Sequence, residues 1–233
     1  MSQPVIALAG AAGDLGTRIA KALIARGAAV RVLAREDAPA HYAQEVIDLG
    51  ATLARADMYG LDALAAACEG AACVVSALNG LYEVIVERQS VLLDATVKAG
   101  TPRFIPSDYS LDFTKTKVGD NRNLDLRRDF MARADRAPIR VTSILNGAFM
   151  DMLGAEMPVI QPRLHCVLYW GDADQPLDFT TKDDVAAYTA AAALDDATPR
   201  ILRIAGDSVS ARELARAMSE VSGERYRPLW AGI

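Results

Sequence analysis

The sequence predicts an α/β fold in which a doubly wound parallel sheet is followed by a smaller C-terminal α+β part. Three observations predict it. Short apolar runs of strand length alternate with segments of helical periodicity from the first residues onward. Glycine and proline separate most of these segments, and 52% of the 233 residues are hydrophobic, enough to cover a sheet on both faces. This alternation is typical of parallel sheets, whose strands must be joined by crossover connections that are usually helical.

The first half of the chain supplies strands and helices in strict alternation. The strands, short runs rich in Val, Ile, Leu and Ala, are expected at Val5–Ala9, Val30–Ala34, Thr52–Ala54, Ala72–Ala77 and Arg103–Ile105. The helices, marked by apolar residues three and four positions apart, are expected at Leu15–Arg26, His41–Leu49, Leu61–Ala67 and Glu83–Ala99. Right-handed connections between parallel strands then place helices on both faces of one sheet.

The second half begins with a polar segment. Residues Ser107–Leu126 show no sustained period, so we expect a loop or lid of about twenty residues, a length often associated with function or mobility. Helices are then expected at Leu126–Ala134, Asp183–Leu194 and Ala211–Ser222, and strands at Arg140–Leu145, Cys166–Tyr169 and Ile201–Ile204. We place a boundary near Asn146, between residues 1–146 and a smaller, interleaved part formed by residues 147–233.

Composition and charge argue against several classes of protein. Lys and Arg total 25 against 30 Asp and Glu, a net charge of −5, so a basic surface for nucleic acid is not expected. No apolar run reaches the length of about 18 residues that a membrane span needs, and the first residues do not resemble a signal peptide. The cysteines (Cys68, Cys73, Cys166) and histidines (His41, His165) are too scattered for a metal site. We expect a soluble, cytoplasmic protein without a metal, nucleic-acid or membrane partner.

The strongest single signal is a glycine-rich turn between the first expected strand and the first expected helix. The first glycine lets the chain leave the strand sharply, the second lets the backbone approach a pyrophosphate, and the third lets the helix pack on the sheet. The helix N-terminus adds N–H donors for the phosphates. A turn that binds nothing is the alternative, but this position in the chain favours a dinucleotide. The cofactor-binding residues expected here are Gly10, Ala12, Gly13, Asp14, Leu15 and Gly16.

The end of the second expected strand decides between NAD and NADP. An acidic side chain there accepts hydrogen bonds from ribose hydroxyls, whereas an arginine pairs with a 2′-phosphate. Arg35 occupies this position, directly after the strand Val30–Ala34. The alternatives are an ordinary solvated arginine, or a ribose contact made by Glu36 instead. We expect NADP(H).

Two later segments are expected beside the same cofactor, because ligands bind at the carboxyl ends of strands in such sheets. Asp57 follows the third strand and is placed either to contact the adenine end or to cap the helix that begins near Leu61. Residues at the end of the fourth strand would let the middle of the cofactor pass close to the backbone. These residues are Ala77, Leu78 and Asn79.

Several segments resemble the NmrA-like family, the atypical short-chain dehydrogenases that include isoflavone reductase-like enzymes. One is the glycine turn followed by Val32-Leu33-Ala34-Arg35. The most specific follows a helix that contains Gln89 and reads Ala99-Gly100-Thr101-Pro102-Arg103-Phe104-Ile105-Pro106-Ser107-Asp108-Tyr109. Asn146-Gly147-Ala148-Phe149 and Asp178–Ala186 look like later segments of the family. The resemblance covers nearly the whole chain.

This resemblance implies a Rossmann domain for NADP(H) in residues 1–146 and a substrate-side part in residues 147–233. It implies an oxidoreductase that transfers hydride between the nicotinamide and a small carbonyl, enone or quinone. Pro106 and Ser107, after the fifth strand, and Asn146 are then expected to line the cofactor near the nicotinamide.

The sequence departs from the family at the proton donor. Reductases of the family use a lysine a few residues before an Arg-Arg pair. Here the pair is Arg127-Arg128, and the corresponding position holds Asn123 or Asp125, depending on the reference point of the count. The lysine expected from the family is therefore missing.

Tyr109 becomes the expected catalytic residue, as a proton donor whose pKa Lys115 or Lys117 would lower. The alternative is a wall residue packed under the following loop. A non-catalytic NADP(H)-binding redox sensor that acts through a protein partner is the alternative function. The missing lysine favours the sensor, whereas the segments Pro106–Tyr109 and Asn146–Phe149 favour the reductase.

Overall fold

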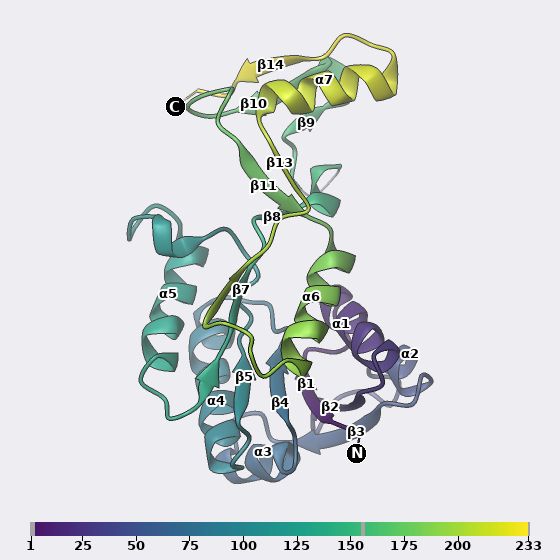
Figure 1. The fold of residues 1–233 in the computed structure, drawn as a ribbon, viewed down its shortest axis with the longest axis vertical. Coiled ribbons are helices and arrows are strands. Elements are labelled where there is room, and N and C mark those ends of the chain that lie inside the picture. Colours follow the sequence, from purple (N-terminus) through teal and green to yellow (C-terminus); the bar gives the residue numbers. More distant parts are fainter. Residues whose placement is uncertain (1–2, 155–156, 233) are drawn as a thin grey trace. The chain divides into compact units, whose positions relative to one another are not determined.

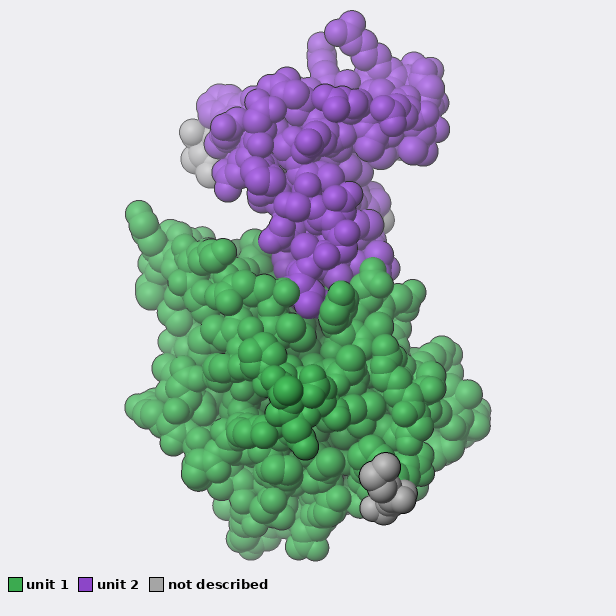
Figure 2. Space-filling model, in the orientation of Figure 1, with its two compact units in different colours: residues 1–145, 183–203 green, residues 146–182, 204–233 purple. Residues whose placement is uncertain are grey.

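The chain divides into two compact units. The structure is a computed structural model that describes residues 3–154 and 157–232. Unit 1 comprises residues 1–145 and 183–203, and unit 2 comprises residues 146–182 and 204–233 (Figure 2). The expected division after residue 146 differs in two respects, because Asn146 itself belongs to unit 2 and residues 183–203 return to unit 1. There β12 (Ile201–Arg203) pairs in parallel with β7 (Ser143–Leu145).

Unit 1 is built on a six-stranded sheet with the order β3-β2-β1-β4-β5-β6 (Figure 1). All neighbouring strands in it are parallel. This is the strand order of the doubly wound Rossmann fold, so the predicted fold class is confirmed. The strands are β1 Val5–Ala9, β2 Ala29–Arg35, β3 Thr52–Ala56, β4 Cys73–Ser76, β5 Arg103–Ile105 and β6 Arg140–Val141. The strand order reverses between β1 and β4, and ligands of such sheets bind at the carboxyl ends beside that switch point.

Helices cover both faces of the sheet (Figure 1). α1 packs against α2 on one face, while α3 packs against α4, and α4 against α5, on the other. The helices are α1 Asp14–Ala25, α2 Gln44–Ile47, α3 Leu61–Cys68, α4 Gln89–Lys98, α5 Arg122–Ala134 and α6 Lys182–Leu194. A π-helical turn, Glu83–Arg88, leads directly into α4. The helix expected over residues 83–99 is therefore continuous, but its first part is π-helical and its second part is α-helical.

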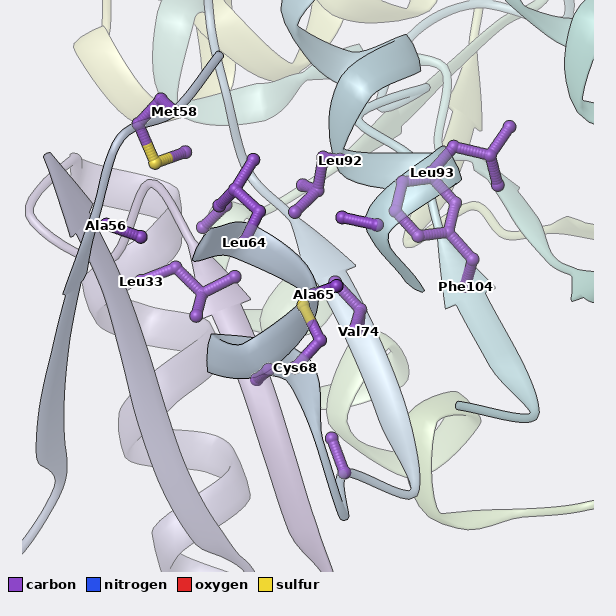
Figure 3. Close-up of a cluster of buried hydrophobic side chains, with 14 of the residues drawn as sticks. Leu33, Ala56, Met58, Leu64, Ala65, Cys68, Val74, Leu92, Leu93 and Phe104 are labelled. Atoms are coloured by element: carbon purple, nitrogen blue, oxygen red, sulfur yellow. The ribbon is translucent and has the colours of Figure 1, made fainter. Parts of the chain in front are cut away.

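A large hydrophobic core lies between the sheet and helices α3, α4 and α5 (Figure 3). Leu33 and Val74 of the strands meet Leu64 and Leu92 of the helices, with Phe104 of β5 beside them. All five side chains are at most 1% exposed. Burying a side chain of this size contributes about 1.5–3 kcal/mol, so this core fixes the strands that present the site.

The polar segment after β5 belongs to unit 1 and packs against the rest of it. Phe113, in a 3-10 turn, is fully buried in a small cluster with Leu145 of β7. The guanidinium of Arg203 donates to the carboxylate of Asp112 at 2.8 Å. Residues 107–121 form the expected loop, with the 3-10 turn Phe113–Lys115 inside it. The buried Phe113 side chain and the ion pair between Arg203 and Asp112 anchor this loop.

Helix α5 begins four residues earlier than expected, at Arg122 rather than Leu126. The side chain of Asn121 caps it by accepting hydrogen bonds from the N–H groups of Asn123 (2.9 Å) and Leu124 (3.2 Å). A polar first turn with an asparagine cap has no apolar period, so periodicity alone does not show this start.

In the described residues of unit 2, two small sheets accompany one long helix, α7 (Ala211–Ser222). A capping box starts the helix: the Glu213 N–H donates to the Ser210 hydroxyl, and the Ser210 N–H donates to the Glu213 carboxylate. Val167 and Tyr226 are buried against α7. The sheets have the orders β14-β10-β9 and β13-β11-β8. The strands are β8 Ala148–Phe149, β9 Ile160–Gln161, β10 Cys166–Tyr169, β11 Leu177–Thr180, β13 Asp207–Val209 and β14 Arg227–Trp230.

Two negative observations concern the described residues. Within residues 3–154 and 157–232, no helix combines the length and the apolar character needed to cross a membrane. In the same ranges, no group of three or more His, Cys, Asp or Glu side chains is arranged to hold a metal ion.

Candidate functional site

The turn between β1 and α1 requires glycine at two positions. Gly10 has a φ of +85°, in the left-handed region, and a Cβ there would lie 2.5 Å from the carbonyl oxygen of Ala77. At Gly16 a Cβ would collide with the carbonyl oxygen of Gly10. Because the obstacles are backbone atoms, no side-chain rotation relieves either clash. These two glycines bring the turn, the start of α1 and the end of β4 into direct contact.

Gly13 differs from both. Its φ is −81° and its ψ is 161°, and a Cβ would meet the Gly10 carbonyl oxygen at 3.4 Å, an ordinary contact. The Gly13 N–H donates to the Gly10 carbonyl at 3.0 Å, and its carbonyl accepts from the Thr17 N–H at 2.8 Å. In the described part of the chain no side chain caps α1 at this point. The first-turn N–H groups of a helix are the donors that phosphates use.

One arginine lies between two carboxylates beside this helix N-terminus. Arg18 donates through Nε to Asp14 at 2.7 Å and through Nη1 to Asp183 of α6 at 2.5 Å. These two hydrogen bonds raise the pKa of Arg18, and the one to Asp14 has the larger effect. Arg18 thus offsets part of the negative charge of the two carboxylates, which would otherwise oppose an anion.

Arg35 ends β2 with an exposed side chain. Its Nε lies 3.5 Å from the carboxylate of Asp37, and both side chains are more than half exposed, so this ion pair holds the guanidinium weakly. The neighbouring Glu36 is also exposed. Arg35 is therefore accessible to an anionic ligand at the carboxyl end of β2.

A pocket of about 380 Å³ joins the glycine turn to the segment after β2. It is lined by Ala12 and Thr17 on one side and by His41 and Tyr42 on the other. Burial raises the pKa of the Tyr42 hydroxyl, while the Ala12 backbone and the charge of Arg35 lower it. Tyr42 thus lies near two predicted cofactor residues. The sequence pattern marked it only as part of a helix, and α2 begins two residues later, at Gln44.

Asp57 forms a local turn after β3. Its carboxylate accepts a hydrogen bond from the N–H of Tyr59 at 2.9 Å, and the side chain is exposed. The residue at the N-cap of α3 is Gly60, without a side-chain cap. The helix-cap alternative for Asp57 is therefore wrong, and contact with the adenine end stays a prediction.

Buried hydrogen bonds tie the ends of β4 and β5 together. The Ser107 hydroxyl donates to the Leu78 carbonyl at 2.6 Å, and the Ser107 N–H donates to Gln89 Oε1 at 2.8 Å. The Gln89 amide donates in turn to the carbonyl of Ile85, within the π-helical turn. The structure thus brings together three of the residues predicted to lie beside the cofactor, Ala77, Leu78 and Ser107. Of the neighbouring predicted residues, Asn79 is exposed and Pro106 is buried. In the sequence, Gln89 was notable only as part of the family resemblance. The structure shows that its buried side-chain amide positions the backbone of Ser107, which no sequence pattern indicated.

Tyr109 lies in the interior rather than at an open surface. The residue is 6% exposed, and its hydroxyl oxygen has almost no accessible area. Burial raises the pKa of this hydroxyl, although Thr189 of α6 lowers it in part. Lys115 pairs with Asp112 instead, at 3.7 Å. The structure therefore argues against the predicted proton donor: a buried phenol with a raised pKa does not exchange protons readily with a substrate.

Tyr109→Phe is expected to change turnover by less than about twofold, whereas loss of a general acid typically costs about 10²–10⁴ in rate. The variant keeps the ring that packs in the interior and deletes only the buried hydroxyl. Steady-state turnover of an accepted substrate tests this expectation. NADPH affinity and thermal unfolding of the variant are measured as controls. A hundredfold fall in turnover at unchanged affinity would restore the tyrosine as the donor.

Both candidate lysine positions lie in the first turn of α5. The Asn123 N–H donates to the capping side chain of Asn121, and the Asn123 side chain is exposed. The Asp125 carboxylate accepts from the N–H of Gly119 at 2.9 Å. These residues shape the start of the helix, and the side-chain amide of Asn123 is not an ionisable group.

Asp108 is the buried end of a chain of polar side chains that starts after β5 and ends at the exposed Asp135. The Ser143 hydroxyl donates to its carboxylate at 2.6 Å, Arg200 Nη1 lies 2.8 Å from that hydroxyl, and Arg200 Nε donates to Asp135 at 2.8 Å. Burial raises the pKa of Asp108 to about 6. The residue supports the fold beside the site.

Asn146 begins unit 2, so it is not among the residues that unit 1 brings together. Its side chain is buried, and its carbonyl accepts from the Thr180 hydroxyl at 2.6 Å. Gly147 has a φ of +69°, and a Cβ there would collide with the carbonyl oxygen of Asp178. The two segments of unit 2 that resembled the family therefore pack against each other.

Comparisons with known proteins agree with the fold and with the family resemblance. The sequence model of the NmrA-like family matches residues 2–228 of this chain. The chain is similar to bifunctional pinoresinol-lariciresinol reductase 1 of Linum usitatissimum, at 26% identity over 240 residues, covering 95% of this chain and 76% of that protein.

Solved structures show the same architecture. The structure of AtPrR2 with NADP+ and (+)pinoresinol has a TM-score of 0.86 at 23% identity and covers 99% of this chain and 79% of that chain. An NADPH-dependent quinone oxidoreductase from Escherichia coli, complexed with NADPH, has a TM-score of 0.78 at 20% identity, with 98% and 78% covered. At these identities the likeness establishes the shared fold.

Proposed function

The chain belongs to the NmrA-like family, and on this premise we propose that it is an NADP(H)-dependent reductase acting on a small carbonyl, enone or quinone. The observation that carries the proposal is the glycine turn. Backbone contacts fix Gly10 and Gly16, while Gly13 leaves the uncapped N-terminus of α1 accessible. The cofactors named for AtPrR2 and for the quinone oxidoreductase support NADP(H), and their substrates support a small organic acceptor.

Each part of the cofactor has a matching set of residues in unit 1. The N–H groups at the start of α1 suit the pyrophosphate, and the exposed guanidinium of Arg35 suits a 2′-phosphate. Asp57 suits the adenine end, and the segment Ala77–Asn79 with Ser107 suits the middle and the nicotinamide end. Bound NADPH supplies a hydride, and the protein supplies binding and orientation.

The proton that accompanies hydride transfer comes from solvent in this proposal. Tyr109 is buried, and the lysine positions of the family hold Asn123 and Asp125 in the first turn of α5. The chain then contributes mainly the placement of two reactants, an effect that alone accounts for large rate enhancements.

The glycine turn also supports a second candidate function. This is a redox sensor that binds NADP(H) without turnover and acts through a protein partner. A sensor needs the glycine turn and Arg35 but no proton donor. It differs from the reductase in one measurable property, which is steady-state oxidation of NADPH.

The test is NADPH oxidation, followed by absorbance, against a panel of quinones, enones, aldehydes and pinoresinol. We expect sustained turnover with at least one acceptor class and none with Gly13→Val, which removes the cofactor site. Saturable NADPH binding without turnover of any acceptor would replace the reductase by the sensor. Absence of NADPH binding would contradict both.

The remaining parts of the proposal rest on composition. The net charge of −5 supports a small-molecule substrate rather than nucleic acid. A cytoplasmic location stays a prediction.

A further inference from the structure

One arginine of β3 holds the main chain that follows β2. Arg55 Nη1 donates to the carbonyl oxygens of Ala38 (2.7 Å), Glu36 (3.1 Å) and Arg35 (3.4 Å). The same segment is closed by a hydrogen bond from the Ala38 N–H to the Arg35 carbonyl at 3.1 Å. We call residues 35–38 the β2 turn. One guanidinium nitrogen thus lies at the point where three carbonyl groups of this turn converge.

The convergence of these carbonyls depends on a cation. Three carbonyl dipoles directed at one point repel one another unless a positive charge lies there, and hydrogen bonds from a charged donor are stronger than those from a neutral donor. The turn also carries the carboxylates of Glu36 and Asp37 beside the guanidinium of Arg35. Its conformation therefore decides whether Arg35 or an acidic side chain meets a ligand at the end of β2.

The strand register separates Arg55 from the side chain of Arg35. In the parallel pair of β2 and β3, Ala34 lies opposite Arg55, and Arg35 lies opposite Ala56. Because successive strand residues face opposite sides of a sheet, Arg55 and Arg35 belong to opposite faces. Arg55 contacts the backbone of the β2 turn and, by this register, lies away from the Arg35 side chain.

We propose that Arg55 is a positioning residue for the choice between NADPH and NADH, acting through the β2 turn that presents Arg35. This inference rests on the proposed function, because it needs Arg35 to meet the 2′-phosphate. Arg55 itself touches main-chain carbonyls, so its removal alters selectivity only through the placement of Arg35.

The experiment compares the dissociation constants of NADPH and NADH by titrating nicotinamide fluorescence. Arg35→Ala is expected to weaken NADPH binding by about ten- to a hundredfold, as loss of a charge-assisted phosphate pair does, with little effect on NADH. Arg55→Ala is expected to weaken NADPH binding by about tenfold and NADH binding by less than twofold. In the Arg35→Ala background, Arg55→Ala should leave the ratio unchanged, because residues that act as a unit are not additive.

Two further variants separate selectivity from stability. Arg55→Lys keeps a cation near the carbonyls and should restore most of the preference for NADPH. Arg31 of β2 is the matched control, because its Nη1 also donates to main-chain carbonyls, those of Ala67 (3.0 Å) and Glu69 (2.7 Å), near the end of α3. Arg31→Ala should lower thermal stability at least as much as Arg55→Ala and leave the cofactor ratio unchanged.

The outcomes distinguish this inference from the proposed function. A wild-type protein that binds NADPH and NADH equally overturns the cofactor assignment and the inference with it. A preference that Arg35→Ala abolishes and Arg55→Ala leaves intact overturns the inference alone. A further loss of preference in the double variant also overturns it, because Arg55 would then contact the phosphate directly.

Discussion

Gly13→Val is expected to raise the dissociation constant of NADPH by about a hundredfold or more while the protein stays folded. A branched side chain at Gly13 occupies the space beside the first-turn N–H groups of α1, where the pyrophosphate must approach. Each charge-assisted hydrogen bond lost there contributes about 1.5–3 kcal/mol, and tenfold in affinity corresponds to about 1.4 kcal/mol. The fold tolerates the change because φ is −81° and, among the described residues beyond its chain neighbours, the new Cβ contacts only the Gly10 carbonyl oxygen, at 3.4 Å.

Two glycines provide matched controls for this substitution. Gly154 has a φ of −76°, and among the residues that the structure describes, chain neighbours apart, no atom lies within 4 Å of a Cβ added there, so Gly154→Val should leave NADPH binding unchanged. Gly16→Val should instead reduce the yield of folded protein, because its Cβ collides with the backbone of Gly10. Titration of NADPH fluorescence and far-ultraviolet circular dichroism separate the two effects. Unchanged NADPH affinity in folded Gly13→Val would remove the turn from the binding site.

Local sequence patterns correctly predicted the elements whose ends are marked by neighbouring residues in the sequence. Val5–Ala9 and Arg103–Ile105 have the expected bounds as β1 and β5, since each is a short apolar run between polar or turn-forming residues. α7 also has its expected bounds, Ala211–Ser222, because a serine cap precedes it and a glycine in the left-handed conformation follows it.

Elements that depend on distant partners were missed. β11 (Leu177–Thr180) pairs with β13 and β8, and the strand β14 pairs with β10, which precedes it by about sixty residues. α2 is shorter than expected because Ala43, inside the expected helix, has a left-handed φ of 55°. No local pattern shows that conformation, since alanine is the strongest helix former.

The site divides in the same way. The roles of Gly10 and Gly16 follow from local backbone geometry, and both positions prove to be crowded by backbone atoms. The burial of Tyr109 depends on α6, whose Thr189 lies eighty residues later in the sequence. The role of Arg55 depends on a turn conformation that brings three carbonyls to one point, which no residue pattern specifies.

Asp108 predicts an unusual pH dependence of stability. Burial raises the pKa of its carboxyl from 3.8 to about 6, although the hydrogen bond from Ser143 lowers it in part. The charges of Arg127 and Arg200 also lower it, and that of Asp135 raises it. The folded state therefore binds this proton more tightly than the unfolded state does. The contribution of Asp108 to the free energy of unfolding is largest below about pH 4 and is lost as the pH rises through about 6, by about 3 kcal/mol in total.

Asp108→Asn is therefore expected to gain stability relative to wild type, by about 2 kcal/mol, as the pH rises from about 4 to about 7. Asparagine cannot ionise, and any cost of its buried amide is the same at every pH, so the difference between the two proteins isolates this carboxyl. Urea unfolding followed by far-ultraviolet circular dichroism measures it. Asp112→Asn is the control, because hydrogen bonds from Thr114 and Arg203 outweigh burial and hold that pKa below its usual value. Its difference from wild type should stay flat above about pH 5. A flat difference for Asp108→Asn as well would mean that Asp108 is ionised in the folded protein throughout this range.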